Sequence, residues 1–403
     1  MLGVTLQFFL NMEIERYTLA TGETVLTGFS RLSRHFGLVM VIMALMTGAW
    51  PGWAATSGTL VTYMIGGDAT LIAIAMMVLA ALMLTFSRVV FWTLERTLAL
   101  KIGLTAVLFG IALLFAIPGD AALEGARRAI SPVLPVEALG WSVILGAIAF
   151  AGMGGAGNLC QSNLIRDKGF GMGAHAPRIV SPLLGEPVAA AGTGWRFAID
   201  AESLRRWRAW WRLANVEQLT TFFAISILTI GFTSLLAFAL LRDQPNLPED
   251  IGFLRVQGEV LGGRVGSWFG IFFWGMGAFA LFGTAIGILD IVSRLSADVI
   301  HTTYGRGRSE SFVYMLVVWT LALFGIAALA AEVAQPLVLI VLSACVAGFA
   351  WFLYAPLLLV LNLSLLPKEL RPGPMRIAAL VTATLVFGAA SFATIADQIR
   401  RFG

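Results

Sequence analysis

Four glycines and an asparagine interrupt one of the apolar segments of this sequence. Gly152, Gly154, Gly155 and Gly157 lie within six residues, and Asn158 follows them directly. Each glycine costs a helix about 1 kcal/mol relative to alanine, so four together predict an unwound stretch. Inside a membrane, released backbone carbonyls are tolerated only where they are buried in protein or line a cavity. Transporters use such unwound backbone to coordinate ions near the middle of the membrane.

The side chain of Asn158 would add a neutral oxygen, which suits a divalent or alkali cation. Gln161, Ser162 and Asn163 continue the polar stripe toward the next loop. Close packing accounts for the same glycines equally well, because small residues let transmembrane helices approach each other without any ligand. The sequence leaves both interpretations open.

The elements that must position this stretch are membrane-spanning helices. Of the 403 residues, 58% are hydrophobic and 12% are charged, roughly half the charge of a soluble domain. The apolar residues form segments that are mostly about 20 residues long, enough to cross a bilayer as helices. This composition excludes a soluble enzyme, a nucleic-acid-binding domain and a disordered chain. We therefore expect an all-α polytopic membrane protein, with the lipid bilayer as its surroundings and no nucleic-acid partner.

The sequence contains ten such segments, which would make about ten transmembrane helices. They are 1–20, 37–66, 70–87, 98–117, 138–164, 216–241, 267–292, 311–331, 335–362 and 375–396.

The distribution of lysine and arginine between alternate loops predicts the orientation. One set of loops holds 20 of these residues and the opposite set holds five. The richer set includes the loop 166–215 and is expected on the cytoplasmic side. The end of that loop, LRRWRAWWRLANVEQL, predicts an interfacial helix with its arginines on lipid headgroups and Trp207, Trp210 and Trp211 at the membrane boundary.

A few charged residues fall inside the apolar segments. Glu13, Glu15 and Arg16 in the first segment are candidates for function, because buried charges in a membrane are rare and usually functional. Glu13 and Arg16 also have the i,i+3 spacing of an ion pair. Asp290 and Arg294 have the i,i+4 spacing of a structural ion pair. The sequence has no nucleophile elbow, zinc-protease motif or phosphate-binding loop. We therefore expect no enzyme activity and no cofactor.

Several stretches of the chain resemble the Nramp-type (natural resistance-associated macrophage protein) divalent metal transporters, especially their divergent bacterial members. FFLNMEIERYTLATGET is similar to the second helix of that family, RVVFWTLERTLALKIGLTAVLFGIALLF to its fifth and GIFFWGMGAFALFGTAIGILDIVSRLSADVI to its eighth. AGMGGAGNLCQSNLIRDKG falls where the broken sixth helix of the family carries Met-Pro-His-Asn. WFLYAPLLLVLNLSLLPKELRPG resembles the end of the tenth helix and the loop after it. The resemblance extends over nearly the whole chain.

The resemblance implies a LeuT-like (APC-type) fold of two inverted five-helix repeats. Residues 1–117 would be the remnant of the first repeat, 138–362 the second repeat and 375–396 an additional helix. The chain would begin at the second helix of the family. The first helix, which is broken and carries Asp-Pro-Gly-Asn in the family, would then be missing.

By the same resemblance, a metal substrate would be bound by Asn158, Gly155 and Gly152. Asn158 retains the asparagine of the family, whereas Gly155, Ala156 and Gly157 replace its Met-Pro-His. Gly152 takes the position of a backbone-carbonyl ligand. Loss of the methionine thioether removes the soft ligand that favours transition metals, and a hard cation such as Mg²⁺ becomes more suitable.

The expected function is secondary active transport of a divalent cation (Mn²⁺, Fe²⁺ or Mg²⁺) across the inner membrane by alternating access. Proton coupling and the oligomeric state stay open. Three alternatives also stay open: a truncated and inactive protein of the same family, a LeuT-fold transporter of a small organic solute, and a membrane-embedded enzyme or structural subunit.

Overall fold

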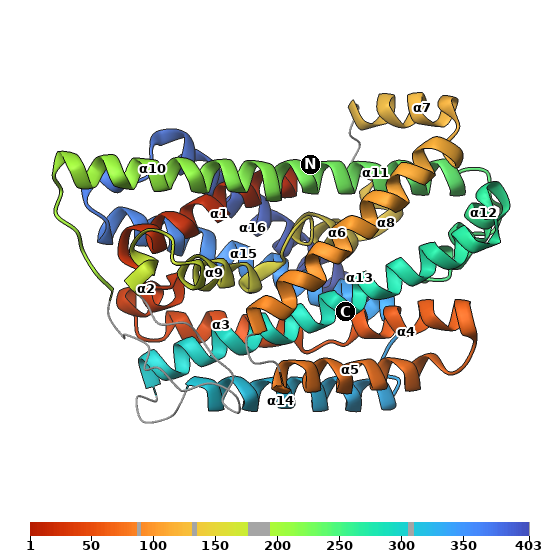
Figure 1. The fold of residues 1–403 in the computed structure, drawn as a ribbon, viewed down its shortest axis with the longest axis horizontal. Coiled ribbons are helices and arrows are strands. Elements are labelled where there is room, and N and C mark those ends of the chain that lie inside the picture. The colour runs from red at the N-terminus through yellow and green to blue at the C-terminus, as the bar shows by residue number, and fades with distance from the viewer. Residues whose placement is uncertain (87–89, 131–134, 176–193, 305–309, 403) are drawn as a thin grey trace.

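The computed structural model describes residues 1–403 apart from 87–89, 131–134, 176–193, 305–309 and 403. Every regular element within these described ranges is a helix (Figure 1). Seven helical spans there are long and apolar enough to cross a membrane, with α3–α4 and α10–α11 each counted as one span. The number is eight if the bent pair α6–α7 also counts as one span. The protein is therefore an all-α polytopic membrane protein. The helices α1 and α8, which cover the first and fifth predicted segments, are not among the seven.

Within its described residues, the chain up to residue 130 forms seven helices. They are α1 (Leu2–Thr21), α2 (Val25–Leu32), α3 (Phe36–Gly48), α4 (Gly52–Ile65), α5 (Ala69–Phe86), α6 (Val90–Phe115) and α7 (Gly119–Ile130). The predicted segment 37–66 is divided between α3 and α4 at Pro51, which has no backbone N–H to continue a helix. The side chain of Thr24 begins α2 by accepting a hydrogen bond from the backbone N–H of Thr27.

The rest of the chain contains the interrupted helix and the longest elements. They are α8 (Val136–Ala149), η1 (Gly155–Cys160), α9 (Gln161–Lys168), η2 (Gly171–His175), α10 (Ala201–Glu217), η3 (Gln218–Ala224), α11 (Ile225–Leu241), α12 (Phe253–Val265), α13 (Ser267–Val299), η4 (Ile300–Tyr304), α14 (Glu310–Ala330), α15 (Pro336–Leu365), η5 (Lys368–Leu370) and α16 (Pro374–Phe402). The elements η1, η2 and η5 are 3₁₀-helices, whereas η3 and η4 are wider π-helices.

The stretch predicted as an interfacial helix forms α10, which continues through η3 into α11. Together they make one helix of 41 residues, Ala201–Leu241 (Figure 1). The four arginines of α10 are exposed, whereas Trp207 is buried and stacks on Trp211 with ring centroids 5.7 Å apart. Residues 176–193 of the predicted cytoplasmic loop, Arg178 among them, lie outside the described residues.

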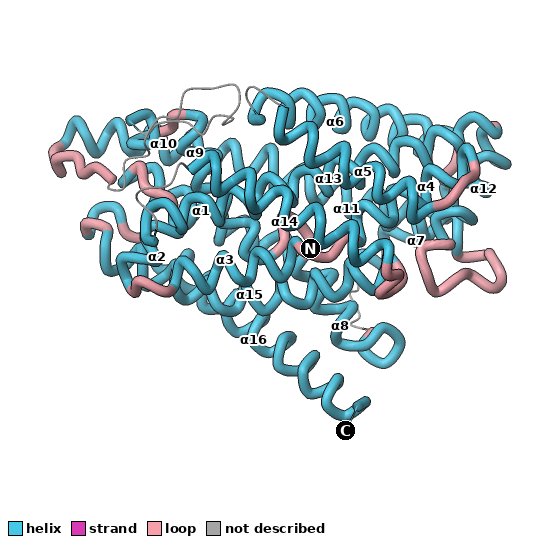
Figure 2. Tube along the Cα trace, turned by 90° about the horizontal axis from the view of Figure 1, so that it is seen from below, coloured by secondary structure: helices cyan, strands magenta, loops and turns pink. Residues whose placement is uncertain are grey.

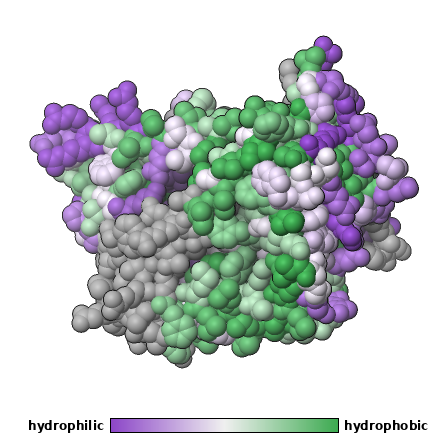
Figure 3. All heavy atoms as spheres, turned by 45° about the vertical axis from the view of Figure 1, so that its right-hand side comes forward, coloured by the Kyte–Doolittle hydropathy of each residue, from purple (hydrophilic) through white to green (hydrophobic). Residues whose placement is uncertain are grey.

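Most of the helices run along the long axis of the molecule (Figures 1 and 2). The short helix α2 and the beginning of α10 lie at one end, and α12 lies at the other. On the face drawn in Figure 3, a broad apolar surface separates hydrophilic regions at the two ends. Exposed leucines such as Leu71, Leu228 and Leu385 are expected on such a lipid-facing surface.

The helix α15 lies at the centre of the core and packs against α3, α8 and α16. Its Trp351 and Tyr354 are fully buried, and Trp351 stacks on Phe387 of α16 at 5.3 Å between ring centroids. This packing fixes Tyr354 beside the interrupted helix.

Candidate functional site: a line of buried polar side chains at the broken helix

The helix predicted over 138–164 is interrupted where the glycines lie. The α-helix α8 ends at Ala149, and a 3₁₀-helix begins only at Gly155. Gly155 has a φ of 60°, which favours glycine, and a Cβ atom there would lie 2.6 Å from the Cα of Ala347. Unwinding and close packing, the two interpretations of the glycines, therefore occur together.

Gln7 of α1 lies against the interruption. A Cβ atom on Gly152 would come within 2.3 Å of Gln7 Oε1, so the glycine leaves the space that Gln7 occupies. Gln7 Nε2 donates to the backbone oxygen of Met153 at 2.9 Å and to Asn158 Oδ1 at 3.1 Å. One carbonyl released by the unwound helix is thus bound by a side chain of another helix.

A line of hydrogen bonds continues from Asn158 through three further side chains. Asn158 Nδ2 donates to Asn11 Oδ1 at 2.7 Å, and Asn11 Nδ2 donates to Gln218 Oε1 at 3.1 Å. Gln218 Nε2 then donates to Glu15 Oε1 at 2.8 Å. We call Gln7, Asn158, Asn11, Gln218 and Glu15 the polar line.

The local structure of two helices brings these residues together. Gln7, Asn11 and Glu15 are spaced by four residues, which places them on one face of α1. Gln218 is the first residue of the π-helix η3, and such wide turns are rare and frequently occur at functional sites. The hydroxyl of Tyr354 adds a contact from α15, 3.3 Å from Asn158 Nδ2.

Every member of the polar line is buried, with an exposed fraction of 8% or less. Buried polar groups cost several kcal/mol when they are unpaired, and nearly all of them are therefore hydrogen-bonded. Two atoms of the line nevertheless have no partner, namely Gln7 Oε1 and Glu15 Oε2. Both are oxygens, so the line has acceptors to spare, and acceptors are what a cation requires.

The predicted metal ligands are neutral oxygen donors at or beside this line. Asn158 belongs to it, and Gly155 and Gly152 lie in the interruption. Both ends of the Asn158 amide are engaged by protein side chains, so a cation would have to replace Gln7 at Asn158 Oδ1. Within the described part of the chain, no group of three or more His, Cys, Asp and Glu side chains could hold a metal ion.

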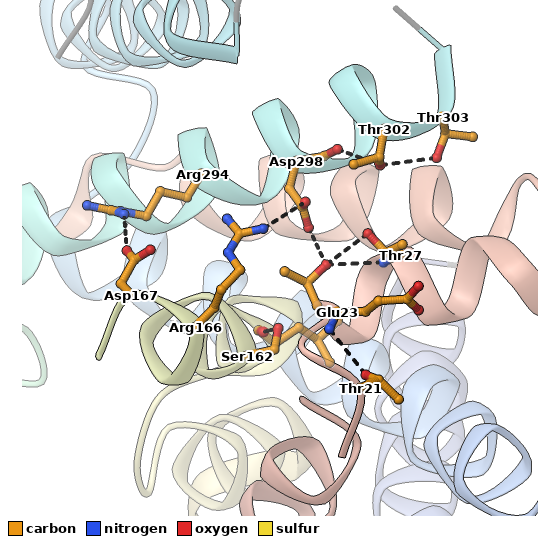
Figure 4. Close-up of polar contacts among 12 residues, drawn as sticks. Thr21, Glu23, Thr27, Ser162, Arg166, Asp167, Arg294, Asp298, Thr302 and Thr303 are labelled. Atoms are coloured by element: carbon orange, nitrogen blue, oxygen red, sulfur yellow. Dashed lines mark hydrogen bonds and ion pairs between the residues drawn. The ribbon is translucent and has the colours of Figure 1, made fainter. Parts of the chain in front are cut away.

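The predicted pair Asp290–Arg294 is confirmed, with Arg294 Nε 2.9 Å from Asp290 Oδ2, and it belongs to a larger cluster. Arg294 also binds Asp167 of α9 at 3.0 Å, and Arg166 lies 3.9 Å from Asp298 of α13 (Figure 4). We call these five residues the inner ion-pair cluster. Arg166 was expected in a cytoplasmic loop but is buried against α13.

The charged residues of the first segment have separate surroundings. Glu13 and Arg16 form the predicted i,i+3 pair at 2.8 Å, and Arg376 NH1 lies 3.4 Å from Glu13 on its other side. Arg16 also lies over the ring of Trp211, 4.1 Å from its centroid. Glu15, in contrast, is bound by two amides. Glu13 is therefore paired with two arginines, whereas Glu15 belongs to the polar line.

Sequence reasoning did not single out four residues of this site: Gln7, Asn11, Gln218 and Tyr354. The spacing of Gln7, Asn11 and Glu15 in an otherwise apolar segment was a signal that could have identified two of them. Gln218 and Tyr354 carry no such local signal, because only the packing of η3 and α15 brings them to Asn158.

A comparison with protein-family models found no match for this chain, and a comparison with curated protein sequences found none either. The geometry of the polar line therefore carries the assignment of function.

Proposed function

We propose that the protein is a secondary transporter that moves a small inorganic cation across the membrane by alternating access. The observation that carries this proposal is a helix broken inside the bundle beside a continuous line of buried amides that ends on a carboxylate. Polar groups at such positions are costly in a membrane and mark ion pathways.

The chemistry of the line favours a hard cation as the substrate. Its amide oxygens suit Mg²⁺, Ca²⁺ and Mn²⁺, and no member of the line offers a thiolate or an imidazole. The divalent cation expected from the resemblance to Nramp-type transporters is compatible with this donor set. Asn158 would be the side-chain ligand, with the backbone at Gly155 and Gly152 beside it.

The order of the helices supports a LeuT-like inverted repeat. A long helix, a short helix and three further spans occur twice, first as α1, α2, α3–α4, α5 and α6 and then as α10–α11, α12, α13, α14 and α15. The two short helices, α2 and α12, lie at opposite ends of the molecule (Figure 1), as expected if one repeat is inverted relative to the other. Equivalent spans also pack together, α4 on α13 and α5 on α14. In this scheme α8, η1 and α9 are the broken helix that opens the second repeat.

The predicted orientation is compatible with the structure. Three elements carry basic residues that the sequence predicts on the cytoplasmic side, namely α2, α9 and the beginning of α10. All three lie toward the same end of the molecule in Figure 1. In our proposal that end faces the cytoplasm and the protein is a multi-pass protein of an inner membrane.

Reconstitution of the full chain into proteoliposomes tests the proposed function. We expect Mn²⁺ or Mg²⁺ to enter and to be detected by a metal-sensitive dye inside the vesicles. Asn158→Ala should reduce uptake at low metal concentration by about tenfold, the effect of losing about 1.4 kcal/mol of binding energy. Gln244→Ala, which removes an amide from the loop after α11, is the control and should leave uptake unchanged.

Two outcomes would contradict the proposal. Equal uptake by the wild type and Asn158→Ala would remove Asn158 from the pathway. Absence of metal uptake by correctly folded wild-type protein would overturn cation transport and favour an inactive protein or a transporter of organic solutes.

A further inference from the structure

All four hydrogen bonds between members of the polar line point in the same direction. Gln7 donates to Asn158, Asn158 to Asn11, Asn11 to Gln218 and Gln218 to Glu15. Asn158, Asn11 and Gln218 each accept through the amide oxygen from the residue before and donate through the amide nitrogen to the residue after, whereas Gln7 only donates. An ionised carboxylate, which accepts hydrogen bonds and donates none, is the natural end of such a chain. The orientation of every amide is therefore linked to the charge on Glu15.

The surroundings of Glu15 do not neutralise that charge. Glu15 Oε1 accepts from Gln161 Nε2 at 2.6 Å and from Gln218 Nε2 at 2.8 Å, and Oε2 has no partner. Only 1% of the residue is exposed, and no described lysine or arginine forms an ion pair with it. The charged side chains that act on Glu15 from α9 and α10 are Lys168 and Glu217, and these two pair with each other.

A buried carboxylate without a cation is costly, and binding a proton removes that cost. A metal ion is less suited to this position, because both amides that reach Glu15 present N–H groups. Gln218 cannot simply turn its oxygen toward Glu15, since that oxygen already accepts from Asn11. Oε2, which has no donor, is the atom that remains for the proton.

We propose that Glu15 is a proton-binding site that couples proton movement to cation binding at Asn158, an inference that rests on the proposed function. Ionised Glu15 holds the chain of amides in the direction described above, with Asn158 Oδ1 bound by Gln7. A proton on Glu15 weakens Oε1 as an acceptor and releases Gln218, so that Asn11 and Asn158 lose their fixed orientation. Gln161, the half-buried first residue of α9, donates to Glu15, and the proton would be exchanged with water at this residue.

Infrared spectroscopy tests the proton site without requiring transport. The pH-difference spectrum of the full chain in lipid should show the carbonyl band of a protonated carboxyl group. This band should disappear in Glu15→Gln, shift in Glu15→Asp and persist in Glu202→Gln, a control at the exposed beginning of α10. An identical band in the wild type and Glu15→Gln would overturn the assignment, provided that gel filtration shows both proteins to be folded.

Transport tests the coupling. Cation uptake by the wild type should rise as the pH falls, by up to about tenfold per pH unit where Glu15 titrates, the response expected of a single essential titrating group. Uptake by Glu15→Gln should be independent of pH, and a pH response equal to that of the wild type would overturn the coupling. If the infrared band behaves as expected but folded wild-type protein moves no metal, the proposed function fails while the proton site stands.

Discussion

Asp167 of α9 and Arg294 of α13 are 127 residues apart in the sequence and form a buried ion pair with a distance of 3.0 Å. Arg294 also binds Asp290, which lies one turn earlier on α13. The residue before Asp167, Arg166, faces Asp298 of α13 (Figure 4). The helix that follows the interruption is therefore attached to α13 at two successive residues. This attachment holds α9, and thereby Asn158, in place.

Replacing Asp167 by asparagine should destabilise the protein. Removal of one partner from a buried ion pair leaves the other charge uncompensated, which costs about 3–5 kcal/mol, and Asp290 keeps the effect near the lower value. Unfolding of the purified protein in detergent measures the change. The control Glu202→Gln breaks the exposed pair with Arg206 and should cost less than about 1 kcal/mol. Equal stability of Asp167→Asn and the wild type would show that the inner ion-pair cluster does not hold α9.

Two neighbouring glycines should respond differently to alanine. Gly155→Ala places a Cβ atom 2.6 Å from the Cα of Ala347 and forces a left-handed backbone conformation on a residue that disfavours it. These two effects should together cost at least about 2 kcal/mol. Gly157→Ala brings its Cβ no closer than 3.5 Å to Ile291 and should be tolerated. The thermal unfolding midpoints of the two variants are measured by size-exclusion chromatography after heating. Equal midpoints would contradict the packing described for η1.

Asn11 and Gln218 should be energetically coupled. Asn11→Leu or Gln218→Leu alone leaves buried partners unpaired, at a cost of about 1–3 kcal/mol for each such group. The double variant removes both sides of their 3.1 Å hydrogen bond, so its cost should be smaller than the sum by about 1–3 kcal/mol. Asn11→Leu combined with Gln398→Leu on α16 is the control pair and should be additive. Additivity of the first pair would mean that the polar line is not continuous at this point.

The beginning of α10 should give a pH-dependent contribution to stability. The backbone N–H of Ser203 donates to Asp200 Oδ1 at 2.7 Å, and this bond lowers the pKa of the Asp200 carboxyl below its ordinary value of 3.8. Since the pKa is lower in the folded state, the stabilisation is present above the unfolded-state pKa and is lost as the pH falls through the folded-state pKa. The difference in thermal midpoint between the wild type and Asp200→Ala should therefore shrink in acid. Asp200→Asn keeps the cap and should lose this pH dependence, and a constant difference would contradict the role of the carboxylate.

The features that the sequence predicted correctly depend on residues close together in the chain. Apolar segment lengths predicted the all-α membrane fold, and the four glycines predicted the interruption before Asn158. The spacings of Glu13 with Arg16 and of Asp290 with Arg294 predicted their ion pairs, because one helical turn fixes the distance between them.

The features that it missed depend on how helices pack. Gln7 and Asn158 are 151 residues apart, and Asn11 and Gln218 are 207 apart. No local pattern specifies which face of η3 meets α1. Arg166 lies at the start of the predicted loop 166–215. Its burial beside Asp298 becomes visible only when α9 packs against α13.

The wide turn at Gln218 has a consequence for how α10 and α11 can move relative to each other. A π-turn holds one residue more than an α-turn, and one residue corresponds to a rotation of about 100° around the helix. If η3 tightened into ordinary α-helix, α10 would rotate by that amount relative to α11 within this 41-residue helix. Gln218 would then face away from Glu15, and the carboxylate would lose the last donor of its amide chain without any hinge opening elsewhere.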